Sequence, residues 1–379
     1  MTDVIVVGAG IAGLVCAIEL VRAGQTVVVL EKESDVGGRV RSTTRDGCII
    51  DHGFQVLFSA YPTINSYLDI PALALRTFRP AAHVISNGKQ SLIGDAMRDA
   101  TLLMGAVAPG VIPMADKLRL LSLRRFAKSL SVGDCFSSTY TSVSTRAFLL
   151  QRGFGAAVVD KFFAPFYGGI LLDRSLSTNA GILLFTFKML SAGDSAVPAR
   201  GMGAIPKQLA AQLPGGTVRT GVAVRSLVIA DPTVHGVVLD DGSTLDATNI
   251  VLAANAPSTA TLAATAGIEV GAGTKGLGST SIYFTSSRAP LSGTSLWLNG
   301  DMNAVISHTI TLTEVAREYA PGQSLLVATA LGRAADLSDE SLEEAARRDL
   351  AHIASVAGEA SLPEMKRVAV WRVPYSQFV

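Results

Sequence analysis

Apolar positions near the N-terminus predict two buried strands joined by a helix. Residues 3–7 form a mostly apolar run that ends at a glycine, which is typical of a strand buried on both faces. Residues 11–23 place apolar side chains at helical spacing, and Gly24 follows as a helix-ending residue. Residues 26–30 form a second apolar run. Together these segments predict one strand–helix–strand unit of about 30 residues.

The pattern then changes to a largely helical region. Asn87-Gly88 predicts a tight hairpin turn. Residues 116–130 and 145–171 carry apolar side chains at helical spacing, so we predict helices there. This region reads as an insertion between two parts of a nucleotide-binding domain.

Strand-like patterns return after about residue 200. The predicted strands cover residues 217–229, 234–239, 249–253, 279–284, 304–310 and 324–330, with an Asp241-Gly242 turn before the third. A last helix is predicted to begin at a capping box, Ser341-x-x-Glu344. It carries Glu343/Arg347 and Glu344/Arg348 pairs at ion-pair spacing.

The charge balance argues against nucleic acid as a partner. The 379 residues include 32 basic and 31 acidic side chains, for a net charge of +1. Charged residues make up 17% and hydrophobic residues 49%, which fits large cores, an apolar ligand or contact with a bilayer surface.

The cysteines and histidines predict neither disulfides nor a metal site. Three cysteines, Cys16, Cys48 and Cys135, are widely spaced, which indicates a reducing, cytoplasmic compartment. The histidines are scattered without metal-ligand spacing. We see no signal peptide, and the longest apolar run, residues 102–114, is too short and too broken by glycine and proline to span a bilayer.

A glycine-rich turn follows the first predicted strand. In Gly8-x-Gly10-x-x-Gly13, the first glycine allows a tight turn, the second lets backbone approach a pyrophosphate, and the third lets the helix pack on the sheet. Glu31 ends the second strand, where a carboxylate accepts hydrogen bonds from an adenosine ribose. The alternative for Glu31 is a solvated surface acid. The candidate cofactor set from this unit is Gly8, Gly10, Ile11, Ala12, Gly13, Glu31 and Lys32.

A second glycine cluster lies shortly after Glu31. Gly37-Gly38-Arg39 offers another close backbone approach and a guanidinium fork suited to phosphate oxygens. Enzymes that bind only a nicotinamide dinucleotide do not need this cluster, so it favours FAD. The alternative is a flexible loop with an exposed Arg39.

These motifs together resemble the FAD-binding superfamily of amine oxidases, phytoene (carotenoid) desaturases and protoporphyrinogen oxidases. The resemblance rests on the glycine triplet, Glu31, Gly38-Arg39 and Asp51-His52-Gly53-Phe54-Gln55. It extends to residues 154–169, which resemble the insertion of the desaturase-like branch, and to residues 201–206 followed by Val224-x-x-Leu227, which resemble the family's segment that returns to the nucleotide domain. The resemblance implies that Gly53, Phe54, Gln55 and Val224 also contact FAD, Val224 through its backbone beside the adenine.

Two departures from the family pattern affect the interpretation. The family closes its FAD site with a C-terminal glycine–aspartate segment, and no such segment is found before Val379. We therefore favour a fragment over an incomplete FAD site. Amine oxidases also commonly place a lysine beside the flavin in a central strand, whereas residues 279–284 contain none and Lys275 is a poor substitute. Desaturase-like chemistry is therefore favoured over amine oxidation.

The predicted fold is α/β, and α+β in part. A Rossmann-type FAD domain of residues 1–72 and 200–260 is interrupted by a helical and mixed-sheet substrate domain of residues 73–199 and 261–379.

The predicted function is an FAD-dependent oxidoreductase that dehydrogenates an apolar small molecule by hydride transfer to flavin. Since the flavin ring performs this chemistry, no obligatory catalytic side chain is expected and none is assigned. The alternatives are a non-redox flavin isomerase, an amine oxidase and a non-catalytic fragment.

Two further features have competing interpretations. His52 is either a base or, preferably, a histidine hydrogen-bonded to backbone. The basic, amphipathic stretch of residues 117–128 either packs its leucines on the insertion, which we favour, or lies on an anionic membrane surface.

Overall fold

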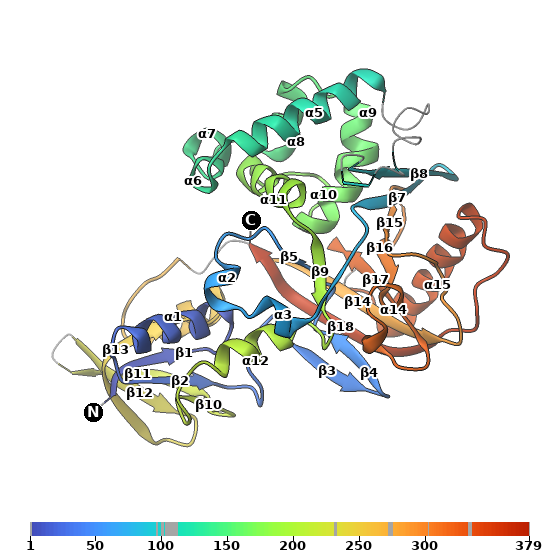
Figure 1. The fold of residues 1–379 in the computed structure, drawn as a ribbon. Helices are drawn as coiled ribbons and strands as arrows, with labels where there is room; N and C mark the ends of the chain where they lie inside the picture. The colour runs from blue at the N-terminus through green and yellow to red at the C-terminus, as the bar shows by residue number, and fades with distance from the viewer. Residues whose placement is uncertain are drawn as a thin grey trace.

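A six-stranded sheet forms the N-terminal part of the molecule, at the lower left of Figure 1. The computed structural model describes residues 2–95, 98–99, 102, 113–230, 233–271, 276–301, 303–332 and 336–378. The strand order is β10-β2-β1-β13-β12-β11. The strands are β1 (Thr2–Val7), β2 (Val27–Glu31), β10 (Val218–Thr220), β11 (Val224–Ala230), β12 (Thr233–Leu239) and β13 (Thr244–Leu252).

The apolar character of β1 follows from burial on both faces. β1 runs parallel to β2 and β13, and helix α1 (Ile11–Arg22) connects β1 to β2, which confirms the predicted strand–helix–strand unit. Val4 and Val6 pack into the core that includes α1, whereas Ile5 and Val7 pack into a second core with β11 and β12. A strand covered on both faces needs an unbroken apolar run rather than alternation.

A seven-stranded sheet forms the opposite side of the molecule, with order β18-β14-β17-β16-β15-β7-β8. Its strands are β7 (Ala81–Ser86), β8 (Lys89–Gly94), β14 (Gly276–Ser286), β15 (Leu296–Asn299), β16 (Ile306–Thr311), β17 (Ser324–Leu331) and β18 (Lys366–Phe378). Helix α15 (Asp339–Val356) packs on one face. The predicted hairpin between β7 and β8 is confirmed, because Asn87 and Gly88 both have the positive φ that this turn requires.

Helices gather at the top of Figure 1 into a separate apolar cluster. They are α5 (Met114–Ser129), α6 (Val132–Cys135), α7 (Ser138–Thr141), α8 (Thr145–Gln151), α9 (Ala156–Val158), a π-helical turn (Val159–Phe163), α10 (Ala164–Leu171) and α11 (Ala180–Ala192). Leu123 and Ala127 of α5 are buried in this cluster, whereas Leu118 and Leu121 are exposed, so one face of the helix packs on the insertion as predicted and the other does not.

Short elements connect these parts. The small sheets are β3 (Ser42–Arg45) with β4 (Cys48–Asp51), and β5 (Leu57–Phe58) with β9 (Ser195–Pro198) and β6 (Leu75–Thr77). The remaining helices are α2 (Ile64–Tyr67), α3 (Ile70–Leu73), α12 (Ala204–Ala210), α13 (Ala256–Ala264), α14 (Leu312–Val315) and a 3₁₀ turn (Arg317–Tyr319). Among the described residues no helix is long and apolar enough to cross a bilayer, and most of the run 102–114 lies outside them. The predicted domain boundaries stay a prediction.

Three predicted elements differ from the observed ones. Residues 145–171 are not one helix, because Gly153 adopts a φ of 85° and ends α8. Residues 217–229 are two strands, because the chain turns at Gly221, with a φ of 70°, and leaves β10 for the far edge of the sheet. The last helix begins earlier than predicted, because Ser338 rather than Ser341 is its N-cap and accepts a hydrogen bond from the Ser341 backbone.

The carboxylate of Asp51 joins segments that are distant in sequence. Its Oδ1 accepts hydrogen bonds from Ser42 Oγ (2.5 Å) and from the Met202 amide (2.9 Å), and its Oδ2 accepts one from the Tyr319 hydroxyl (2.7 Å). The Asp51 carbonyl accepts a further bond from the Tyr283 hydroxyl (2.8 Å). Burial raises the pKa of Asp51, against the lowering effect of these hydrogen bonds.

We expect Asp51→Ala to destabilise the protein by about 3 kcal/mol, because it leaves two buried donors and one partly buried donor without their acceptor. Chemical denaturation measures the change. Glu19→Ala removes an exposed ion pair with Arg22 and should change stability by about 0.5 kcal/mol or less. Equal effects of the two substitutions would contradict this role of Asp51.

Candidate cofactor and substrate site

The three glycines of the first turn meet different surroundings. A Cβ atom on Gly13 would lie 2.0 Å from the Gly8 carbonyl oxygen, and one on Gly8 would lie 3.0 Å from that of Ala253. A Cβ on Gly10 would meet no atom within 4 Å. Gly8 and Gly13 therefore serve internal packing, whereas Gly10 borders open space at the start of α1.

The first turn of α1 is suited to an anion. Gly10 is the N-cap and has no side chain, and the first turn contains no acidic residue. Backbone N–H groups and the helix dipole therefore favour a negatively charged group at this end. Ile11 lines the adjoining cavity and Ala12 is exposed.

Glu31 points toward the glycine turn. Its side chain is only 6% exposed, so the alternative of a solvated surface acid is wrong. Oε2 accepts a hydrogen bond from the Ala9 amide at 2.8 Å, and Oε1 accepts one from the Glu33 amide at 3.0 Å. The next residue, Lys32, is exposed.

The second glycine cluster lies directly against the first. Gly37 forms a parallel bridge with Gly10, and its amide donates to the Ala9 carbonyl at 2.8 Å. Gly38 has a φ of 57°, and a Cβ there would lie 3.4 Å from the Gly10 Cα. The structure thus brings the two predicted phosphate-binding segments together.

Arg39 is exposed but does not lie on an unattached loop. Its Nη1 donates to the carbonyls of Tyr375 (3.1 Å) and Ser376 (2.6 Å) in β18. Gln55 Nε2 donates to the Arg39 carbonyl at 2.7 Å. These bonds tie the glycine cluster to the last strand and to the Gly53–Gln55 turn, while the phosphate contact of Arg39 stays a prediction.

Val224 lies where the chain passes from β10 to β11. The Gly221 amide donates to the Glu33 carbonyl at 2.8 Å, and the Val222 amide donates to that of Glu31 at 2.9 Å. The start of β11 is therefore held beside the carboxyl end of β2. This proximity agrees with the predicted adenine contact of Val224.

His52 carries a buried nitrogen that has no hydrogen-bond partner among the described residues. Its ring stacks on Trp371 with centroids 3.5 Å apart, and Nδ1 accepts a hydrogen bond from Arg41 Nε at 3.3 Å. The preferred expectation of a bond to backbone is wrong, because the partner is a side chain. Burial, and secondarily the charge of Arg41, lowers the pKa of His52 to about 4. The neutral ring therefore carries its proton on Nε2, which is buried and unpartnered.

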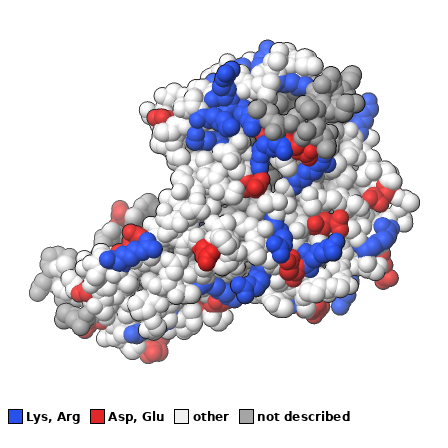
Figure 2. All heavy atoms as spheres, in the orientation of Figure 1, with Lys and Arg blue, Asp and Glu red and all other residues white. Residues whose placement is uncertain are grey.

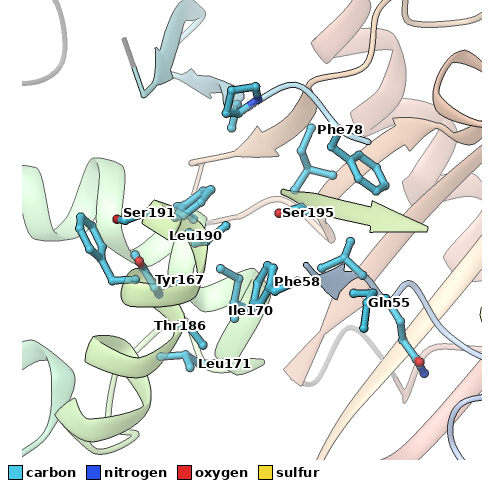
Figure 3. A pocket seen from close by; sticks show the side chains of 18 of the residues that line it. Gln55, Phe58, Phe78, Tyr167, Ile170, Leu171, Thr186, Leu190, Ser191 and Ser195 are labelled. Atoms are coloured by element: carbon cyan, nitrogen blue, oxygen red, sulfur yellow. The ribbon is translucent and has the colours of Figure 1, made fainter. Parts of the chain in front are cut away.

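A cavity of about 1800 Å³ extends from the glycine turns to the helical cluster. Figure 3 shows Ile170, Leu171 and Leu190 on the helical wall, facing Phe58 and Phe78. Its walls are mostly apolar, and its volume exceeds that of a usual single-ligand pocket of roughly 300–1,000 Å³. It has room for a flavin ring and a substrate together.

Two residues of the cavity region were missed by sequence reasoning. Ser281 of β14 accepts a hydrogen bond from the Phe54 amide at 3.2 Å, and His308 of β16 lines the cavity. No local motif marks either one, since strand pairing brings them together. Among the described residues β14 contains no lysine, and Lys275 lies outside them.

These residues fit FAD. Gly10 leaves space for a pyrophosphate, Glu31 offers a buried acceptor, and His52 Nε2 is a buried donor that needs an acceptor. Residues 11–378 also match the family described as flavin containing amine oxidoreductase. The chain belongs to this family. Family membership supports FAD as the cofactor, which confirms that prediction.

Three similar proteins illustrate this relationship. Protoporphyrinogen oxidase 2 of Arabidopsis thaliana is 34% identical over 173 residues, which are 44% of this chain and 32% of that enzyme. Putrescine oxidase of Kocuria rosea is 57% identical over 77 residues, 20% of this chain and 16% of that enzyme. These matches span about a third of the curated relatives' length or less.

A solved structure supports the predicted fold. An oxidoreductase from Methanosarcina mazei has a TM-score of 0.71 at 18% identity, and the match covers 98% of this chain and 88% of the other. The predicted α/β class with a Rossmann-type unit is therefore confirmed.

We expect Gly10→Ala to fold normally but to weaken FAD binding by at least about tenfold, because the added methyl group fills space needed by the pyrophosphate. Fluorescence titration of the apoprotein with FAD measures the affinity. Gly215→Ala is the matched control, since its Cβ would also meet nothing within 4 Å. Unchanged FAD affinity in Gly10→Ala would refute this placement.

Proposed function

We propose that this chain is the FAD-binding and substrate-binding part of an oxidoreductase that dehydrogenates an apolar small molecule. The single observation that carries the proposal is the large apolar cavity beside the glycine turns. When bound, FAD supplies the oxidising ring that accepts two electrons from the substrate. We also propose that the predicted cofactor residues contact FAD, and that the predicted domain boundaries separate the FAD-binding part from the substrate-binding part.

The protein's own residues would bind FAD, orient the flavin and shield the cavity from water. Gly10 and the start of α1 would hold the pyrophosphate, and Glu31 the adenosine ribose. The Gly53–Gln55 turn would border the flavin, since its members line the cavity and are fixed by Ser281 and Arg39. Apolar walls such as Phe58 and Ile170 would exclude water.

The charges at the cavity disfavour a protonated amine as the substrate. Asp95 carries the one carboxylate among the described residues that line the cavity. Its Oδ1 lies 2.9 Å from Arg124 Nη1, so the two side chains form an ion pair. A protonated amine taken into a mostly apolar cavity loses hydration, and an available carboxylate would offset that loss most strongly. The pairing of Asp95 therefore supports desaturase-like or protoporphyrinogen-oxidase-like substrates.

Anaerobic mixing tests this function. We expect the FAD-loaded protein to lose its yellow absorption with a polyene or reduced porphyrin, and to keep it with putrescine. Bleaching by putrescine would instead indicate an amine oxidase. Product formation without consumption of an electron acceptor would indicate an isomerase, and no bleaching by any organic donor would favour a non-catalytic protein.

We further propose that α5 rests on an anionic membrane surface beside the cavity mouth. Met114, Leu118 and Leu121 are 56%, 63% and 55% exposed, and their spacing places them on one helix face. All three line the cavity. Lys and Arg side chains gather in the upper part of Figure 2, where Figure 1 places α5, and Arg125 and Lys128 are exposed. This combination suits entry of a lipophilic substrate from a bilayer.

We expect the double substitution Leu118→Glu and Leu121→Glu to abolish sedimentation with vesicles of phosphatidylcholine and phosphatidylglycerol, because both glutamates oppose insertion and anionic headgroups. Leu150→Glu, at a residue that is 43% exposed on α8, serves as the control. If the unmodified protein stays in the supernatant with these vesicles, the membrane proposal is wrong.

A further inference from the structure

His308 places an imidazole in the wall of the apolar cavity. The residue belongs to β16 and is only 4% exposed. Its ring centroid lies 5.4 Å from that of Phe54, in the turn that we assign to the flavin. In the described part of the chain Nδ1 is buried without a hydrogen-bond partner. A buried polar group in this state calls for an explanation, because burial without a partner costs free energy.

A row of polar side chains across three strands positions this imidazole. Ser281 of β14 pairs in register with Thr329 of β17, and Thr329 pairs with His308. The hydroxyls of Ser281 and Thr329 lie 3.2 Å apart, and Ser281 also accepts the hydrogen bond from the Phe54 amide. Phe54 is thus held by Ser281 through its backbone and borders His308 with its ring. The row lies on the sheet face opposite α15.

Gly169 provides the room for the ring and defines its orientation. A Cβ atom at Gly169 would lie 3.1 Å from His308 Nδ1, so any larger residue would press on the imidazole. Nδ1 therefore faces the backbone of α10. His308 lines the cavity, and Nδ1 is the ring nitrogen that is buried against the protein. The other ring nitrogen, Nε2, therefore borders the cavity.

The ring is neutral at pH 7, and its proton can be assigned. Burial, and then the charge of Arg174, lowers the pKa of His308 to about 4. A buried N–H without an acceptor is rarer in proteins than a buried acceptor without a donor. We therefore assign the lone pair to Nδ1, beside Gly169, and the proton to Nε2. The cavity consequently has a neutral N–H donor in an otherwise apolar wall.

We propose that His308 is a specificity-determining residue whose Nε2–H donates a hydrogen bond to a carbonyl-type oxygen of an otherwise apolar substrate. The inference rests on the proposed function, since it assumes that the substrate occupies this cavity. A donor in a mostly apolar wall restricts the orientation of a ligand that shape alone leaves free to rotate. Because the donor adjoins Phe54, the recognised oxygen lies near the bond to be oxidised.

Binding of two matched probes to the FAD-loaded protein tests this proposal. Acetophenone has a carbonyl acceptor, whereas ethylbenzene has nearly the same shape and none. We expect the preference for acetophenone to fall about fivefold to tenfold in His308→Phe, which keeps a ring but removes the donor. His308→Gln retains an N–H donor and should restore part of the preference. Isothermal titration calorimetry gives the dissociation constants without requiring turnover.

His83→Phe is the matched control. His83 lies in the same sheet, stacks on Trp297 with centroids 4.0 Å apart and pairs with Gln90, and its pKa is also lowered to about 4. We expect the His83→Phe substitution to leave the preference for acetophenone over ethylbenzene unchanged.

Two outcomes would overturn the proposal: an unchanged preference for acetophenone in His308→Phe, or an equal loss of that preference in His83→Phe. If the preference is unchanged and the flavin absorption maximum of probe-free His308→Phe shifts, His308 donates to the flavin instead. Failure to bind FAD at all would count against the proposed function, not against His308 alone.

Discussion

The buried carboxylate of Asp51 holds together the segments from which the site is built. It accepts hydrogen bonds from Ser42 in the same hairpin, and from the Met202 amide and the Tyr319 hydroxyl in two distant parts of the chain. Residues 52–55 follow directly and form the edge of the cavity. A carboxylate with several buried donors has few alternative geometries, because each displaced donor would lose its partner. The position of the cavity edge therefore follows from the position of this one side chain.

Backbone contact, rather than charge, brings the two glycine clusters together. Gly37 bridges to Gly10, and Gly38 approaches the Gly10 Cα closely enough that a side chain would meet it. Two chain segments without side chains can approach in this way and still leave an open space above Gly10. A diphosphate bound there would meet backbone N–H groups at the start of α1. Arg39 is held by β18, so the last strand also helps to fix the cluster.

The cavity combines neutral polar groups with paired charges. His52 and His308 both have a pKa lowered to about 4, so both are neutral donors at pH 7. Asp95 and Arg124 form an ion pair at 2.9 Å. Such an interior favours mostly apolar molecules with a few hydrogen-bond acceptors, since the lining carboxylate is already paired with Arg124 and a cation would lose hydration on entry. This balance also explains why the mostly apolar composition fits an enzyme with a large cavity.

The sequence by itself determined the strand–helix–strand unit, the glycine turn and the acidic end of β2. Each of these depends on neighbouring residues: an apolar run, a helical period, and glycines where the backbone must turn or approach closely. The hairpin at Asn87-Gly88 was predictable for the same reason. Local signals were less reliable where a glycine broke a pattern, as at Gly153 and Gly221.

Only the tertiary structure decided which distant residues meet. The contacts of the Met202 amide and Tyr319 with Asp51, and the register of Ser281 with Thr329 and His308, join segments that are separated in the chain. No spacing encodes such contacts, because they depend on how whole sheets pair and pack. The neutral state of His308 likewise depends on burial, which a histidine in a sequence does not reveal. The local pattern thus specified the cofactor fold, while long-range packing specified the cavity and its chemistry.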